Sequence, residues 1–150
     1  ETADLNGFTP RDEATGEPLS PPDFTDVGVP PVDPPADPEP EPEDETEVTY
    51  GTDQRDTIFG RGGDDEIYGR GGGDFISGGS GDDVIRGGDG GDELRGNYGA
   101  DSIFGNQGDD VIRGGAQDDY LQGGEGHDFV DGGYGNDDIF GDKNNDTLRG

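Results

Sequence analysis

The chain has 150 residues and a formal net charge of −29, from 38 acidic and 9 basic side chains. So acidic a chain lacks the positive surface with which nucleic-acid-binding proteins neutralise phosphates. Only 24% of the residues are hydrophobic and 32 are glycine, which excludes an ordinary buried core, and no run approaches the roughly 20 apolar residues that span a membrane. The chain is therefore either disordered or held together by something other than a core.

The first 50 residues have the composition of an extended linker. All 11 prolines lie between Pro10 and Pro42, and residues 1–50 hold 15 acidic side chains and one basic one, Arg11. The polyproline II bias of proline and the repulsion between like charges both extend such a segment. We therefore expect residues 1–50 to form a disordered, acidic, Pro-rich linker between domains. The alternative is a docking peptide that a partner binds.

From Gly51 onward the sequence repeats every nine residues. Eleven units fill residues 51–149 without an insertion, and Gly150 has the place of a twelfth unit's first residue, so we expect the array to be truncated there. Position 1 is Gly in every unit, position 6 is Asp in every unit, and position 8 is always Ile, Leu or Val. A strict short period is typical of a solenoid, in which each unit is stable only when stacked on others.

Each nine-residue unit is expected to form one tight turn and one short strand. Glycine at fixed positions indicates a backbone that repeatedly adopts positive φ, which glycine tolerates best. Positions 7 to 9 form an extended trio, in which the middle side chain points away from the face that its neighbours occupy. We therefore predict that position 8 faces inward and that positions 7 and 9 face solvent.

The aspartates of position 6 indicate a bound cation. One apolar residue in nine does not offset the entropy lost on ordering a glycine-rich chain, and stacking brings like-charged carboxylates together. Carboxylates and turn carbonyls are the oxygen ligands of Ca²⁺, whereas one His and the absence of Cys and Met disfavour zinc and copper. We therefore predict calcium binding. The predicted metal ligands are Asp56, Asp65, Asp74, Asp83, Asp92, Asp101, Asp110, Asp119, Asp128, Asp137 and Asp146.

This pattern resembles the calcium-binding nonapeptide of the RTX proteins, the hemolysin-type repeat of secreted bacterial toxins, proteases and lipases. Residues 78–86 (GGSGDDVIR) and 87–95 (GGDGGDELR) fit it at every defined position, and the resemblance covers about two-thirds of the chain. It implies an all-β fold, a right-handed parallel β-roll or β-solenoid with two units per coil. Calcium ions are then expected between the loops of units i and i+2.

The resemblance also implies two ladders of aspartates, one from the odd-numbered units and one from the even-numbered units. Five gaps between stacked loops in one ladder and four in the other imply about nine calcium ions. Units that depart from the pattern are expected to bind more weakly. Unit 1 carries Gln54 and Arg55 and is expected to act as an N-terminal cap, and Gln117 replaces the position-4 glycine of unit 8.

From this resemblance we expect the chain to be a calcium-dependent folding module of a secreted bacterial protein, which type I secretion machinery exports unfolded and which folds outside the cell. The chain is not expected to be an enzyme, because it has neither an HExxH zinc motif nor a GxSxG nucleophile motif, and its one histidine, His127, lies in a loop. Two alternatives stay open. One is a calcium-stabilised adhesin or surface-layer element that contacts glycans at the cell surface through the aromatic side chains of positions 7 and 9. The other is the C-terminal module of a larger RTX toxin or hydrolase.

Overall fold

The computed structural model describes residues 45–150 as strands joined by tight turns, with no helix in that range. The expected linker over residues 1–44 lies outside the described residues. No segment within 45–150 is a helix apolar and long enough to cross a membrane. The strands are β1 (Val48–Tyr50), β2 (Thr57–Gly62), β3 (Glu66–Gly71), β4 (Phe75–Ser80), β5 (Val84–Asp89), β6 (Glu93–Tyr98), β7 (Ser102–Gln107), β8 (Val111–Ala116), β9 (Tyr120–Glu125), β10 (Phe129–Tyr134), β11 (Asp138–Lys143) and β12 (Thr147–Arg149).

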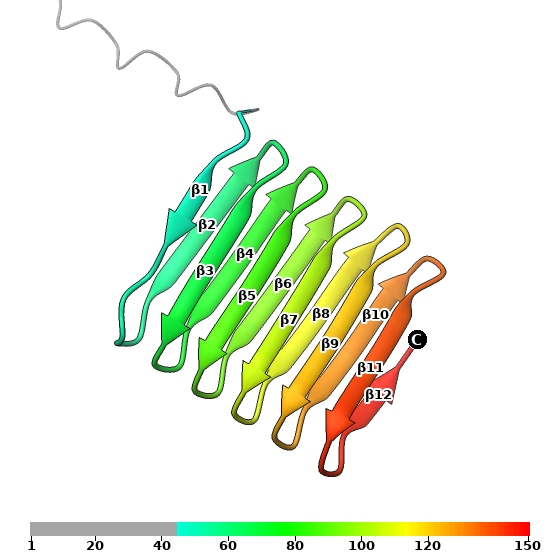
Figure 1. The fold of residues 1–150 in the computed structure, drawn as a ribbon. Helices are drawn as coiled ribbons and strands as arrows, with labels where there is room; N and C mark the ends of the chain where they lie inside the picture. The colour runs from blue at the N-terminus through cyan, green and yellow to red at the C-terminus, as the bar shows by residue number, and fades with distance from the viewer. Residues whose placement is uncertain (1–44) are drawn as a thin grey trace, which may run out of the picture. The chain divides into compact units, whose positions relative to one another are not determined.

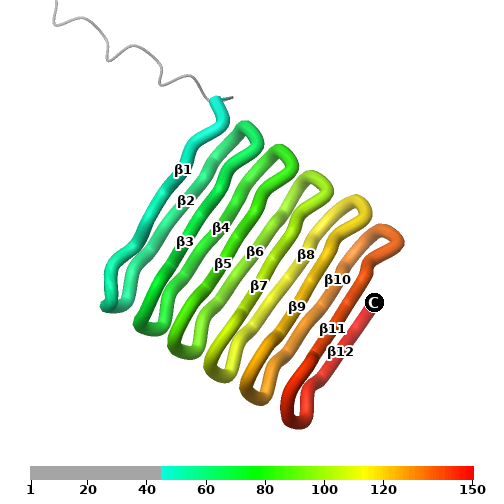
Figure 2. The backbone as a smooth tube through the Cα atoms, in the orientation of Figure 1, coloured from blue at the N-terminus to red at the C-terminus, as the bar shows by residue number. Residues whose placement is uncertain are grey.

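The strands alternate between two parallel sheets. The odd-numbered strands form one six-stranded sheet in the order β1-β3-β5-β7-β9-β11, and the even-numbered strands form the other. Each strand pairs with the strand two places along the chain, so that Ile67 lies opposite Ile85 and Ile76 opposite Leu94, 18 residues apart. The chain therefore passes from one sheet to the other and back once in every two repeats (Figures 1 and 2). This arrangement confirms the predicted parallel β-solenoid with two units per coil.

The core between the sheets is one row of position-8 side chains from each sheet. The eight central members are fully buried, and Ile58 and Ile139 pack against them at the two ends of the row. Burying each of these aliphatic side chains stabilises the fold by about 2–3 kcal/mol. The prediction that position 8 faces inward is confirmed. The fully buried residues are Ile67, Ile76, Ile85, Leu94, Ile103, Ile112, Leu121 and Val130.

The strands are longer than the sequence pattern predicts. A three-residue strand is expected at positions 7 to 9, but β2 to β11 each have six residues and continue to position 3 of the following unit. Pairing in β2 skips Gly60 and resumes with Arg61 opposite Gly79 and Gly62 opposite Ser80. The glycine-rich segment is thus partly sheet, and the turn itself is confined to positions 4 to 6.

Positive φ recurs at positions 2 and 4 of every unit from the second to the eleventh. Most of these residues are glycine, as expected, but Arg61 and Arg70 adopt φ values of 83° and 81° at position 2. At position 4, Gln117 has a φ of 85° and Asn144 one of 76°. Side-chain-bearing residues are strained in this region, Asn less than Gln. The weakened units therefore keep the backbone shape of the others at some cost in free energy.

The invariant glycine of position 1 has a different cause from the one predicted. Its φ is not positive in any described unit, so conformational freedom does not explain it. A Cβ at Gly105 would overlap the Asp110 carboxylate and stand 2.5 Å from the carbonyl oxygen of Gly123. Position 1 is glycine because the aspartate of its own unit and the backbone of the next coil leave no room for a side chain.

The roll begins before the expected boundary at residue 51. Val48–Tyr50 form β1, and Thr49 lies opposite Ile67 in the same register as every later pair. Assigning these three residues to the linker was therefore wrong. They are β-forming residues in phase with the repeat, but their loop has neither the glycines nor the aspartate that make the pattern visible.

Replacing Gly105 by Ala is expected to lower the free energy of unfolding by about 2 kcal/mol, because the new Cβ overlaps the Asp110 carboxylate. Gly71→Ala is the matched control, since a Cβ at this position-3 glycine has no neighbour nearer than 3.5 Å. It should change stability by less than about 0.5 kcal/mol. Urea unfolding followed by circular dichroism measures both, and equal effects would contradict the steric explanation of position 1.

Candidate metal centre

The two edges of the roll bring the position-6 aspartates into two rows. Each aspartate lies at the end of a turn, immediately before a strand, and stacks on the aspartate 18 residues away. Eight of them are only 1–3% exposed, which is unusual for ionisable side chains. Asp56, Asp137 and Asp146, at the ends of the rows, are half-buried. The structure thus brings together all eleven predicted ligands, as two ladders.

One carboxylate oxygen of each buried aspartate holds the stack together. The backbone N–H of Asp65 donates to Oδ1 of Asp83 over 2.9 Å, and the N–H of Asp83 donates to Oδ1 of Asp101 over 2.9 Å. The same bond recurs along both ladders, from Asp56 to Asp146 on one edge and from Asp65 to Asp137 on the other. Each aspartate is therefore tied to the backbone of the preceding coil.

The other oxygen, Oδ2, has no partner. In all eight buried aspartates, from Asp65 to Asp128, this atom is inaccessible to water and accepts no hydrogen bond. A buried carboxylate oxygen without a donor or cation costs several kcal/mol, and here the cost recurs coil after coil. The unsatisfied atoms therefore indicate that a positively charged group belongs beside them.

Backbone carbonyls point along the stack at the same edges. A Cβ at Gly81 would collide with the carbonyl oxygen of Gly63, and one at Gly79 with that of Arg61, each one coil earlier. Carbonyl oxygens of positions 2 and 4 thus face the gap between loops. Within residues 45–150 no three His, Cys, Asp or Glu side chains form a metal-binding group. A cation here would need carbonyl ligands as well as carboxylates, which suits Ca²⁺ and its six to eight oxygens.

Comparison with known proteins identifies the repeat. A family model described as the RTX calcium-binding nonapeptide repeat (4 copies) matches residues 50–85, 86–121 and 113–148. The chain belongs to this RTX family. No curated protein and no solved structure matches it. RTX repeats bind calcium and form β-rolls. The proteins that carry them are typically secreted and bacterial, and the repeats are typically non-catalytic.

Burial raises the pKa of the central aspartates of the RTX roll. The pKa rises to about 7 for Asp101 and Asp110 and to about 6 for Asp83, Asp92 and Asp119. Loss of hydration is the main cause, the backbone N–H that each accepts opposes it, and the neighbouring aspartates add to it. A buried carboxylate with a raised pKa is less stable as an unpaired anion than after it has bound a proton or a cation.

Position 5 of the RTX repeat also reaches across the gap between coils. Where it is Asp, its Oδ1 accepts the backbone N–H of position 5 one coil later, as Asp82 does from Ala100 over 2.8 Å. Where it is basic, it reaches a carbonyl instead. Arg55 Nε donates to the Gly73 oxygen over 3.1 Å, and His127 Nδ1 lies 3.1 Å from the Asn145 oxygen. Arg55 thus binds a loop oxygen of the first odd gap, in keeping with the weak site expected there. The acidic members are Asp64, Asp82, Asp109 and Asp118.

The aromatic side chains of positions 7 and 9 pack against one another and against arginines. Arg86 lies over the rings of Tyr68 and Phe104, at 5.1 and 5.3 Å from their centroids. The row continues from Phe104 through Tyr120 to Phe140, with ring centroids 5.8 and 5.4 Å apart. These contacts follow the outer face of the odd-stranded sheet, and they stabilise the pairing of successive coils.

The sequence pattern missed Glu47, which extends one ladder. Its backbone N–H donates to Oδ1 of Asp65 over 2.8 Å, as the aspartate of a preceding unit would. The only sequence signal was spacing, since Glu47 lies nine residues before Asp56. Its loop has no glycine, so the match to the repeat was not visible.

In the absence of calcium, the roll is expected to be more stable at pH 5 than at pH 8. The central aspartates have pKa values of about 6 to 7 when folded and about 4 when unfolded, so the folded state binds more protons between these values. Protonation therefore stabilises the fold fully below about pH 4, and this contribution is lost as the pH rises through 7. Circular dichroism in EGTA measures the folded fraction.

Calcium titrations at each pH provide the control, because calcium binding requires ionised carboxylates. The calcium concentration at half-folding should fall as the pH rises from 5 to 8. A calcium-free folded fraction that increases over this range would contradict the burial of unpaired carboxylates.

Proposed function

We propose that the chain is a calcium-dependent folding module, with Ca²⁺ bound between the loops of units i and i+2. The observation that carries this proposal is the row of buried Oδ2 atoms without a partner on each edge. A divalent cation between coils would satisfy two such carboxylates at once and cancel their mutual repulsion. Because the unfolded chain has no preformed site, the free energy of binding would become free energy of folding.

The ligands of each gap would be the position-6 aspartates of two stacked units together with the carbonyl oxygens of positions 2 and 4. All eleven aspartates of the column, from Asp56 to Asp146, take this role in the proposal. About nine ions would fill five gaps of the odd ladder and four of the even ladder. They would bring about +18 against the net charge of −15 over residues 51–150.

This chemistry suits a protein that folds only after export. At low calcium the buried charges oppose folding, whereas the millimolar calcium outside cells falls in the affinity range of extracellular calcium modules. We infer secretion through a type I exporter as an unfolded chain, followed by folding outside the cell or at its surface. The acidic, Pro-rich residues that precede the roll would act as a spacer. We propose no catalytic role for this chain, and an attached toxin or hydrolase domain would supply any activity.

An adhesive or surface-layer role is the second candidate. One observation favours it: the aromatic row of the odd-stranded sheet is open to solvent at its end, where Phe140 is 46% exposed. Alanine replacements at Tyr68, Phe104 and Phe140 separate the two roles. Loss of binding to cells or glycans with calcium-dependent folding intact would support adhesion.

Addition of about 10 mM CaCl₂ to the calcium-free chain at pH 7.5 is expected to convert a disordered circular dichroism spectrum into a β-sheet spectrum. EGTA should reverse the change. Magnesium at the same concentration is the control, because Mg²⁺ retains its water shell in preference to an all-protein cage. A spectrum that calcium leaves unchanged would overturn the proposed function.

Replacing both Asp83 and Asp101 by Ala is expected to raise the calcium concentration at half-folding several-fold, because each removes a ligand from two neighbouring gaps of the even ladder. Asp89→Ala is the matched control, since this position-3 carboxylate is exposed and lies outside the position-6 column. Calcium titration followed by circular dichroism compares the variants. Equal midpoints for the two changes would contradict the assignment of position 6.

A further inference from the structure

The segment of residues 45–47 continues the even edge of the roll by one more loop. Glu47 lies 18 residues before Asp65 and takes the place of position 6 in a unit that precedes the eleven repeats. Its N–H donates to Asp65 Oδ1 over 2.8 Å, and its carbonyl accepts the N–H of Glu66 over 2.8 Å. The equivalent bonds between Asp65 and the next coil are 2.9 and 2.8 Å. The backbone therefore forms another rung although the sequence does not match the repeat.

Burial of Asp65 shows the effect of this extra loop. Asp65 is 3% exposed and its Oδ2 has no partner, like the aspartates in the centre of the roll. Asp56 begins the odd ladder, and no loop from residues 45–150 precedes it there; it is only half-buried. Because Asp65 Oδ1 accepts the amide of Glu47, the carboxylate faces the gap between the two loops. A buried carboxylate with one unsatisfied oxygen therefore borders a gap outside the nine that the repeats define.

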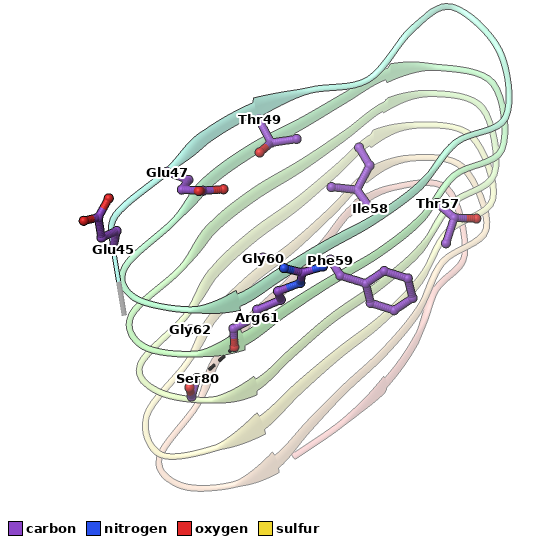
Figure 3. Close-up of a pocket in the computed structure, with 10 residues that line it drawn as sticks. All are labelled: Glu45, Glu47, Thr49, Thr57, Ile58, Phe59, Gly60, Arg61, Gly62 and Ser80. Atoms are coloured by element: carbon purple, nitrogen blue, oxygen red, sulfur yellow. Dashed lines mark hydrogen bonds between the residues drawn. The ribbon is translucent and has the colours of Figure 1, made fainter. Parts of the chain in front are cut away.

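A backbone carbonyl faces the same gap. A Cβ at Gly63 would stand 2.5 Å from the carbonyl oxygen of Glu45, which therefore occupies the place of the position-4 carbonyl in the other coils. The side chain of Glu47 extends into the coil, toward a cavity of about 780 Å³ that Thr49, Ile58 and Arg61 also line (Figure 3). Arg61 makes no ion pair with Glu47 in the described part of the chain.

From this geometry we propose an additional calcium site at the N-terminal end of the even edge. The carboxylates of Glu47 and Asp65 and the carbonyl oxygen of Glu45 would bind the ion. The site rests on the calcium-binding role proposed above, and it adds one ion to the even ladder. The first gap of the odd ladder differs, because there the Arg55 guanidinium already binds the Gly73 carbonyl. The two edges therefore end differently. The even edge ends in a metal site, and the odd edge ends in the guanidinium of Arg55.

Native mass spectrometry of the full chain in saturating calcium tests the site by counting bound ions. Glu47→Ala should bind one ion fewer than the wild type. Glu45→Ala should bind as many as the wild type, because Glu45 contributes its backbone carbonyl rather than its side chain. Glu47→Asp should restore the full count, since it replaces one carboxylate by the one that the repeat itself uses.

Circular dichroism of the same samples establishes whether the roll remains folded. Equal counts for the wild type and Glu47→Ala would overturn the additional site and would indicate that Arg61 or solvent neutralises Glu47. Loss of several ions together with strand signal would also overturn it, because residues 45–47 would then act only as a cap. A wild-type chain that binds no calcium would instead overturn the proposed function, so the two failures are distinguishable.

Discussion

The structure depends on one bond: the backbone amide of a position-6 aspartate donates to the carboxylate of the aspartate 18 residues later. This bond sets the register between coils on both edges of the roll. It also fixes the carboxylate where water does not reach it, with its second oxygen unsatisfied. The side chain that orders the stack therefore creates the demand for a cation, and folding and metal binding depend on the same atoms.

The glycines follow from the position of that carboxylate. Position 1 has no side chain because the Asp110 carboxylate and the Gly123 backbone occupy the space around Gly105, and equivalent atoms do so in other coils. Positions 2 and 4 have positive φ, which directs their carbonyl oxygens at the next coil. Most of the composition that seems unsuited to folding is thus required for close stacking, and the single apolar residue of each unit only fills the narrow space between the sheets.

Features that recur in every unit were predictable from the sequence, whereas features of the chain outside the repeats were not. The nine-residue period was sufficient to predict a solenoid, the inward row of position 8 and the stacking of the aspartates, because each follows from a strict column. The resemblance to RTX repeats added the parallel sheets, the two units per coil and the division of the aspartates into two ladders. Strand length was not predictable, since hydrogen bonding through Arg61 and Gly62 depends on the neighbouring coil rather than on local propensity. Val48–Tyr50 and Glu47 were missed because they adopt the backbone conformation of the repeat without its characteristic glycines and aspartate. The cause of the position-1 glycine was also invisible, because steric exclusion and positive φ select the same amino acid.

The alternation of the two sheets limits how the length of such an array changes in evolution. Arg86 contacts Tyr68 and Phe104 across one sheet because the three residues are 18 apart in sequence. Duplication or loss of 18 residues adds or removes a whole coil and leaves these rows on their own face. A change of nine residues transfers every downstream side chain to the opposite face, so that arginines and aromatic rings acquire new neighbours and a basic position 5 moves to the other edge. Gain and loss in pairs of repeats is therefore the change that the fold tolerates, although the motif is only nine residues long.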